Sequence, residues 1–315
     1  MILDIICLVL GFLLLVKGAD VFVEGASKLA EKFHIPEIVI GLTVVAFGTS
    51  APEAAVSITS AFKGTTGIGV GNIIGSNIAN VLLILGVSGV IGTIIVKKST
   101  LKKEIPFVIF ITLLLPVLGL VGDGISFVDG LILWALFLAF LYHLYLESKN
   151  GNEDAIDDVP QLEETDTFPK LLFMIFLGIG AIVIGSNMAV EGASGIASFF
   201  GVSDRVIGLT IVAIGTSLPE LMTSFMASLK GKNDLAVGNI VGSNIFNILF
   251  VLGTAALVSP AVIPFSMVYL FDIVIALGAI IMFVLFINPK NMQLRKWGAA
   301  IMLICYFSYL IYTVI

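Results

Sequence analysis

The chain has 315 residues, of which 58% are hydrophobic and only 12% are charged, and its mean hydropathy is +1.13. Soluble domains carry about 25% charged residues, so this composition excludes an ordinary soluble fold. Several apolar runs reach about 20 residues, the length of a helix that crosses a bilayer. Because these runs do not alternate with polar residues, they also exclude a β-barrel. We expect an all-α polytopic protein in a lipid bilayer, with no nucleic-acid partner and no protein partner that the sequence identifies.

Hydropathy and turn residues predict ten membrane-spanning helices, five in each half of the chain. In chain order they are Ile2–Phe33, Pro36–Ala61, Gly67–Ile91, Ile105–Val121, Phe127–Leu146, Phe168–Phe200, Ser203–Leu229, Asp234–Val258, Ile263–Ile287 and Met292–Ile315. No basic segment or small-residue cleavage site marks a signal peptide, so the N-terminal segment is interpreted as the first span. The first and sixth spans are longer than a bilayer requires, and we expect them to tilt or protrude.

The distribution of Lys and Arg predicts the orientation of the chain. Thirteen of these residues lie in or beside the loops that follow odd-numbered spans, whereas only Lys63 and Arg205 follow even-numbered spans. The positive-inside rule then places both termini on the extracellular or periplasmic side of an inner or plasma membrane. Residues 1–146 and 168–315 form two five-span repeats. The acidic residues 147–167 form a solvated cytoplasmic linker, because their spacing does not match a calcium-binding EF-hand.

The two halves repeat one sequence at an offset of 167 residues. VIGLTVVAFGTSAPE (39–53) matches VIGLTIVAIGTSLPE (206–220) at 12 of 15 positions, and GNIIGSNIAN (71–80) matches GNIVGSNIFN (238–247) at 8 of 10. Such a repeat indicates homologous halves. Because each half has an odd number of spans, the second half crosses the membrane in the opposite sense. Inverted repeats with interrupted helices at the midplane are typical of secondary transporters.

GTSAPE and GTSLPE each place a proline and a glutamate inside an apolar span. Ser50 fits the N-cap of a capping box, with Glu53 in the reciprocal position. We therefore expect the second span to break at Gly48–Ser50 and the seventh at Gly215–Ser217, with free carbonyls before each break. A carboxylate at mid-membrane costs about 2.5–3.5 kcal/mol. Its presence in both halves favours a functional role for Glu53 and Glu220 over capping alone.

The second motif, GNIIGSNIAN, carries polar residues on one stripe of a helix. Asn72, Ser76 and Asn80 are four residues apart and therefore share a face. The glycines are typical of close helix packing, and we interpret Asn72 and Asn77 as hydrogen-bonding to neighbouring helices. The residues expected to face an ion are Ser76, Asn80, Ser243 and Asn247.

The candidate ligands at the interruptions and stripes are all oxygen donors. They are the side chains of Glu53, Glu220, Thr49, Thr216, Ser50, Ser217, Ser76, Ser243, Asn80 and Asn247, with the carbonyls of Ala46 and Ala213. Oxygen ligands suit hard cations, and Ca²⁺ takes about 6–8 of them. Two carboxylates balance one Ca²⁺, and several Na⁺ ions or two protons neutralise them equally well. His34 and His143 are the only histidines, which disfavours a histidine-based metal site or a Ser-His catalytic pair.

GTSxPE followed by GNxxGSNxxN, present in both halves, resembles the α-repeats of the calcium/cation antiporter (CaCA) superfamily, most closely its prokaryotic sodium/calcium exchangers. The resemblance covers essentially the whole chain. It implies ten spans in two inverted repeats, with the first and sixth spans sliding against a core of the other eight. It also implies exchange of about three Na⁺ ions for each Ca²⁺, and hence an electrogenic cycle with transported ions but no cofactor.

The resemblance also implies roles for individual residues. The family's central calcium site corresponds here to Glu53 and Glu220 with Thr49 and Thr216. The sodium sites would add Ser50, Ser217, Ser76, Ser243 and the carbonyls of Ala46 and Ala213. Asn80 and Asn247 take the remaining central positions, at one of which some relatives carry Asp.

Three other functions are compatible with parts of this pattern. Proton/calcium exchange would use both glutamates as proton carriers, and other divalent cations could compete for the same oxygens. A cation channel could use the same acidic residues without an obligatory counter-ion. An intramembrane hydrolase is disfavoured because Ser50 has no histidine near it in the sequence. We expect a transporter and not an enzyme.

Overall fold

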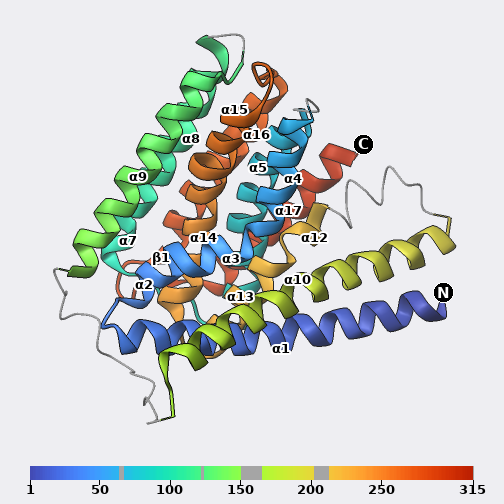
Figure 1. Cartoon of the computed structure of the whole chain (residues 1–315), viewed down its shortest axis with the longest axis vertical. Helices are drawn as coiled ribbons and strands as arrows, with labels where there is room; N and C mark the ends of the chain where they lie inside the picture. Colours follow the sequence, from blue (N-terminus) through green and yellow to red (C-terminus); the bar gives the residue numbers. More distant parts are fainter. Residues whose placement is uncertain (64–66, 122–123, 150–164, 202–212, 315) are drawn as a thin grey trace.

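The structure is a computed structural model that describes residues 1–63, 67–121, 124–149, 165–201 and 213–314. Within these ranges the chain is almost entirely helical (Figure 1). The first half comprises α1 (Ile2–Lys32), α2 (Glu37–Ile40), η1 (Gly41–Val45), α3 (Ala46–Thr49), α4 (Ala51–Phe62), α5 (Gly67–Ala79), η2 (Asn80–Ile84), α6 (Leu85–Ile91), α7 (Lys98–Lys102), α8 (Glu104–Val121) and α9 (Phe127–Lys149).

The described part of the second half has a similar order of helices and adds a short hairpin before its last helix. It comprises α10 (Phe168–Phe199), α12 (Ala213–Thr216), α13 (Leu218–Leu229), α14 (Asn233–Phe246), η5 (Asn247–Leu252), α15 (Gly253–Val258), α16 (Val268–Phe286), β1 (Ile287–Asn288), β2 (Gln293–Leu294) and α17 (Lys296–Val314). The predicted all-α membrane fold is confirmed. The predicted start of the seventh span at Ser203 and most of the predicted linker lie outside the described residues.

Two helix starts differ from the sequence prediction by four or five residues, at Val268 and Lys296. The ninth span begins at Val268 instead of Ile263, because Ile263 pairs with Ile125 in an isolated antiparallel bridge that joins the two halves. The segment between α16 and α17 forms a short hairpin in which Ile287 pairs with Leu294. Apolar residues in these turns extend the hydropathy signal beyond the helices themselves.

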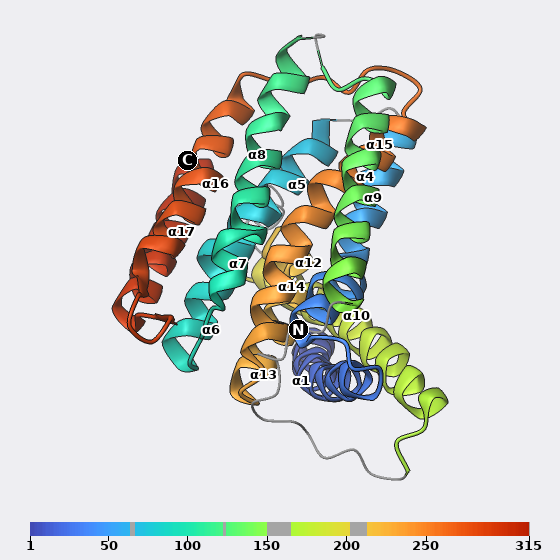
Figure 2. The same cartoon turned by 90° about the vertical axis from the view of Figure 1, so that its left-hand side faces the viewer.

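α1 and α10, the equivalent first helices of the two halves, lie side by side and run antiparallel (Figure 1). The pair crosses the remaining helices at a steep angle, and α1 is seen nearly end-on in Figure 2. Their contact is lined by glycines at seven-residue intervals, namely Gly11, Gly18, Gly25, Gly178, Gly185 and Gly192. A Cβ on Gly185 would lie 2.7 Å from the carbonyl oxygen of Gly11. The two backbones therefore touch, as small residues permit in membrane helix pairs.

The second and seventh spans are broken where the sequence predicts. The helix Glu37–Thr49 bends by 55° from α4 at Ser50. In the second half, α12 ends at Thr216 and α13 begins at Leu218, so Ser217 lies between them. Proline in the first turn of the outgoing helix, as in both GTSxPE motifs, removes no helical hydrogen bond. The breaks turn the first residues of α4 and α13 toward the interior, where Glu53 and Glu220 are each 1% exposed.

The helices that carry the second motif form the centre of the bundle. In an apolar 18-residue stretch of Gly69–Ile91, and likewise of Asn233–Val258, 83% of residues are buried, against 22% in Phe127–Lys149. Outer helices thus present apolar side chains to lipid, whereas these two are enclosed by protein. Each contains a π-helical segment, η2 and η5, beginning at Asn80 and Asn247. Such segments are rare and occur mostly at functional sites.

Candidate ion-binding site

Glu53 and Glu220 meet at the centre of the molecule, one from each half. Each lies in the first turn of a helix, α4 or α13, and each side chain is almost fully buried. The two carboxylates are close enough to repel each other. Among the described residues, neither forms an ion pair with a Lys, Arg or His side chain. The centre therefore carries two carboxylates with no cation from the protein beside them.

The capping box predicted for Ser50 and Glu53 is wrong. Ser50 occupies the N-cap position of α4, but its side chain makes no cap hydrogen bond. Its Oγ lies instead 2.9 Å from Oε1 of Glu220 and 2.9 Å from Oγ of Ser243. The Ser50 hydroxyl would normally accept a hydrogen bond from a backbone N–H in the first turn of α4. It contacts the glutamate of the other half instead. Ser217, the equivalent residue, likewise makes no cap hydrogen bond.

The threonines of the two motifs also contact the glutamate of the opposite half. Thr216 approaches the carboxylate of Glu53, and Thr49 approaches that of Glu220. Thr49 Oγ1 in addition lies 3.0 Å from Oδ1 of Asn239, whose Nδ2 donates to Ser224 Oγ at 2.8 Å. Each glutamate thus has a threonine hydroxyl of the opposite repeat beside it.

Four asparagines form a reciprocal pair of hydrogen bonds across the centre. Asn80 Nδ2 donates to Oδ1 of Asn244 at 2.9 Å, and Asn247 Nδ2 donates to Oδ1 of Asn77 at 3.0 Å. The offset of 167 residues relates these two bonds to each other. The amide oxygens of Asn80 and Asn247 have no hydrogen-bond donor within the described chain. The predicted supporting role of Asn77 is consistent with this arrangement.

The centre contains an unusual concentration of buried oxygens that lack a hydrogen-bond donor among the described residues. They are Glu53 Oε1 and Oε2, Glu220 Oε2, Asn80 Oδ1, Asn247 Oδ1 and Ser217 Oγ. Buried polar atoms are normally paired, because leaving one unpaired costs about 1–3 kcal/mol. Acceptors gathered in this way suit a positively charged ligand with hard, oxygen-preferring coordination.

Both halves of the chain match one known protein family. The model of the family described as "Sodium/calcium exchanger protein" matches residues 3–146 and again residues 170–315. The chain belongs to the sodium/calcium exchanger family. This membership makes the protein a cation/Ca²⁺ exchanger, a transporter and not an enzyme, as the repeated motifs predict.

Relatives of this exchanger cover nearly its full length. It is 37% identical to the inner membrane protein YrbG of Escherichia coli K12 over 287 residues, 86% of either chain. It is 32% identical to the sodium/calcium exchanger MaX1 of Methanosarcina acetivorans, covering 98% of this chain and 97% of the relative. The crystal structure of the sodium-calcium exchanger NCX_Mj, soaked with zero Na⁺ and Ca²⁺, superposes with a TM-score of 0.83 at 33% identity over 99% of both chains.

The remaining predicted ligands of this exchanger include Ser76 and the carbonyls of Ala46 and Ala213, and the prediction for Ala46 needs a correction. Ser76 is buried on α5, one turn before Asn80. The carbonyl of Ala46 accepts the backbone N–H of Ser50 at 3.0 Å, so it is not free as predicted. The Thr49 hydroxyl lies 3.4 Å from the same carbonyl oxygen and is a second donor to it. In the second half the backbone N–H of Ser217 donates to the carbonyl of Ile214. Ala213 is the first residue of α12.

Sequence reasoning did not place Asn239 at the site. Its first-half equivalent, Asn72, donates to Ser57 Oγ at 3.1 Å, as predicted for a packing residue. Asn239 makes the matching bond to Ser224 but also contacts Thr49 and, at 3.4 Å, the carbonyl of Glu220. The repeat predicts only the shared bond. The additional contacts depend on how the two halves approach each other.

Proposed function

We propose that this exchanger moves Ca²⁺ across the membrane in exchange for Na⁺, by alternating access to one central site. The observation that carries the proposal is the cluster of donor-free buried oxygens around Glu53 and Glu220. The cluster has two negative charges, no basic partner among the described residues, and ligands from both halves. A site that includes both repeats can open to either side when the repeats exchange conformations.

The ligands of the central Ca²⁺ would be the two carboxylates and the threonines that face them, Thr49 and Thr216. Sodium ions would use the outer oxygens of the same cluster, with one or both carboxylates. The proposed sodium ligands are Ser50, Ser217, Ser76, Ser243 and the carbonyls of Ala46 and Ala213. Asn80 and Asn247 take the remaining central positions, beside the proposed Ca²⁺. The absence of thiolate or imidazole from the set favours Na⁺ and Ca²⁺ over softer metals.

Obligatory exchange follows from the shared charge. One Ca²⁺ neutralises both carboxylates, and so do Na⁺ ions, but the two loads compete for the same oxygens. The ion-free site carries two uncompensated charges in a buried position, which is costly inside a membrane. Conformational switching without an ion is therefore disfavoured, and each turnover must carry one load or the other. About three Na⁺ per Ca²⁺, the ratio implied by the family resemblance, would make the cycle electrogenic.

The contacts of the first helices support one state of an alternating cycle. α1 packs against α13, whereas α10 makes no comparable contact with α4, its repeat equivalent, within the described chain. α1 contacts α13 near the C-terminal end of α13, where Lys230 pairs with Asp20 at 2.7 Å. By the positive-inside rule this end faces the cytoplasm. We propose that the structure is closed toward the cytoplasm, with both termini on the opposite side.

Flux into sealed proteoliposomes tests the proposal. Ca²⁺ uptake driven by an outward Na⁺ gradient is expected in the wild-type protein and absent in Glu53→Gln and Glu220→Gln. Removing one charge that pairs with a buried partner costs about 3–5 kcal/mol, or a hundredfold or more in affinity. Glu191→Gln, an exposed glutamate on α10, is the matched control and should retain uptake. Wild-type uptake by Glu53→Gln would contradict the proposal.

The same vesicles separate Na⁺ coupling from its rivals. Release of loaded Ca²⁺ by external Na⁺ at constant pH supports sodium exchange, whereas release only by a pH gradient indicates proton exchange. A channel would pass Ca²⁺ without any counter-ion, at rates that rise with the electrical gradient alone. Ca²⁺ movement that requires neither Na⁺ nor H⁺ would therefore overturn antiport.

A further inference from the structure

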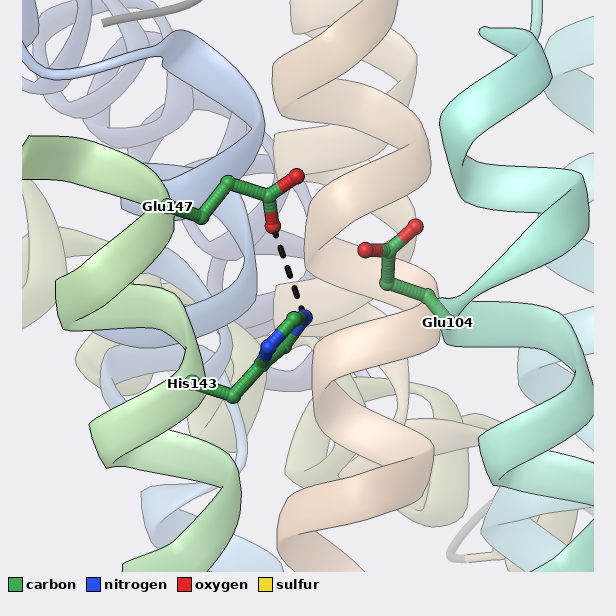
Figure 3. A group of neighbouring side chains, drawn as sticks. All are labelled: Glu104, His143 and Glu147. Atoms are coloured by element: carbon green, nitrogen blue, oxygen red, sulfur yellow. Dashed lines mark ion pairs between the residues drawn. The ribbon is translucent and has the colours of Figure 1, made fainter. Parts of the chain in front are cut away.

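A second cluster of metal-ligating side chains lies at the interface of α8 and α9, apart from the central site. Glu104 lies at the start of α8, and His143 and Glu147 lie near the end of α9. One ligand atom from each residue falls within 4.8 Å of the others. Figure 3 shows the three side chains converging from the two helices. His143 and Glu147 are four residues apart, so the helix places them on one face.

Glu104 is a buried carboxylate with an unsatisfied oxygen. The residue is 4% exposed, and its Oε2 has no hydrogen-bond partner within the described chain. It lines a pocket of about 280 Å³ together with Lys103 and His143, and the rest of the pocket wall is formed by Phe107, Leu136, Ala139 and Phe140. A carboxylate held in apolar surroundings without a donor is costly to keep charged unless a cation compensates it. This observation is independent of the clustering itself and points to a ligand.

Charges around the cluster leave an excess of negative charge. Lys103 Nζ donates to Oε1 of Glu147 at 2.6 Å, whereas Oε2 of Glu147 lies 3.7 Å from Nε2 of His143. Two carboxylates and one lysine sum to −1 before the imidazole is counted. The lysine therefore occupies one oxygen of Glu147 and leaves Glu104, the imidazole and the other oxygen of Glu147 available.

The ligand set differs in kind from the central site. One imidazole with two carboxylates is a set typical of Zn²⁺ and related divalent transition metals, and three protein ligands leave a position for water. Ca²⁺ and Na⁺ prefer oxygen ligands alone. The scarcity of histidine argues against such a site from sequence alone. The contribution of Glu104 becomes visible only when α8 and α9 are packed together.

We propose that Glu104, His143 and Glu147 form a second cation site, selective for a divalent transition metal, that joins the start of α8 to the end of α9. The site shares no residue with the transport site. A bound ion would compensate the unsatisfied carboxylate of Glu104 and cross-link two of the outer helices. α9 in turn packs on the central helix through Phe137, whose ring centroid lies 6.0 Å from that of Phe246 and 5.5 Å from that of Phe250.

Isothermal titration with Zn²⁺ tests the site in the full-length protein. The parent for the measurement carries Glu53→Gln and Glu220→Gln, so that binding at the transport site is removed, and Na⁺ is kept in the buffer. One Zn²⁺ per chain is expected. His143→Gln should weaken Zn²⁺ binding at least about tenfold, as should Glu104→Gln, because each removes a direct ligand. Ca²⁺ titrated in place of Zn²⁺ should show no such site.

Lys103→Gln is expected to change the Zn²⁺ affinity in the opposite direction. It removes the positive charge that competes for Glu147, so Zn²⁺ should bind more tightly than in the parent. A variant that merely unfolds cannot produce this gain. Equal Zn²⁺ affinity in the parent and in His143→Gln would overturn the proposal, and so would weaker binding in Lys103→Gln. Because the parent lacks both central carboxylates, failure here leaves the proposed Na⁺/Ca²⁺ exchange unaffected.

Discussion

The hydroxyl oxygen of Ser50, in the first half, lies 2.9 Å from Oε1 of Glu220, in the second. The same hydroxyl also contacts Ser243 at 2.9 Å. The hydroxyl of Ser217, the equivalent residue 167 positions later, has no partner among the described residues. Two motifs that are nearly identical in sequence thus use the same serine in different ways. Ser50 holds the acid of the opposite repeat, whereas Ser217 leaves an acceptor available for an ion.

This asymmetry predicts different effects of two equivalent substitutions. Ser50→Ala removes a hydrogen bond to a carboxylate and should lower the free energy of unfolding of the ion-free protein by about 1.5–3 kcal/mol. Ser217→Ala removes no such bond and should cost less than about 0.5 kcal/mol in the absence of ions. Thermal unfolding in detergent, in Na⁺- and Ca²⁺-free buffer, measures both. Equal losses in the two variants would contradict the arrangement at Ser50.

A second prediction concerns the asparagine pairs that orient the central amides. Asn77 Oδ1 accepts the hydrogen bond from Asn247 Nδ2 at 3.0 Å and so fixes which way the amide oxygen of Asn247 points. Asn77→Ala should weaken Ca²⁺ binding about 10–100-fold, the usual cost of removing a group that orients a ligand. Asn77→Asp keeps an acceptor at this position and should lose less. Calorimetric titration with Ca²⁺ in Na⁺-free buffer compares them, and wild-type affinity in Asn77→Ala would exclude the orienting role.

A third prediction concerns the contact between α1 and α10. Gly185 and Gly180 both lie on α10, but a Cβ on Gly185 would meet the backbone of Gly11 at 2.7 Å, whereas a Cβ on Gly180 would meet nothing within 4 Å. Gly185→Ala should therefore destabilise the protein by about 1–3 kcal/mol, as overpacking does. Gly180→Ala should be neutral or stabilising by up to about 1 kcal/mol, because alanine favours the helix. Unfolding in detergent tests the pair, and equal stabilities would show that the helices separate easily.

Much of the site was predictable because the repeat marks it. Two acids at equivalent positions in apolar spans are costly, so their presence in both halves identifies Glu53 and Glu220 as the centre of the site. The helix breaks followed from the same motifs, since proline in a first turn fits only the beginning of a helix. These predictions use local chemistry, and the 55° bend at Ser50 agrees with them.

The direction of the polar side chains was not predictable from local sequence. A capping box relates Ser50 to Glu53 within one helix, but the structure has Ser50 bonded to Glu220 because the second half presents a carboxylate at bonding distance. Likewise, no periodicity in the sequence predicts the π-helical segments that begin at Asn80 and Asn247. Contacts between the halves decide both features, and no signal within one half contains them.

The ion pair between Asp20 and Lys230 leads to a prediction about the conformational equilibrium. These residues lie 2.7 Å apart where α1 packs near α13, and both are partly exposed, at 37% and 29%. Their repeat equivalents are Asn187 and Lys63, which cannot form an ion pair. If alternating access exchanges the conformations of the two repeats, Lys63 lies beside Asn187 in the opposite state. Its partner is then a neutral amide and not a carboxylate. The ion pair therefore favours the state seen here over its inverse.

Asp20→Asn should shift the equilibrium toward the inverse state, and Asn187→Asp should shift it in the same direction by giving Lys63 an acid. An exposed pair contributes about 0.2–1 kcal/mol, so each shift should be at most about fivefold and should shrink at high salt. Hydrogen exchange of α13 backbone amides, compared at low and high salt, reports release of α1 from α13. Unchanged exchange in Asp20→Asn at low salt would mean that the glycine-lined pair and its apolar contacts alone set the balance between the two states.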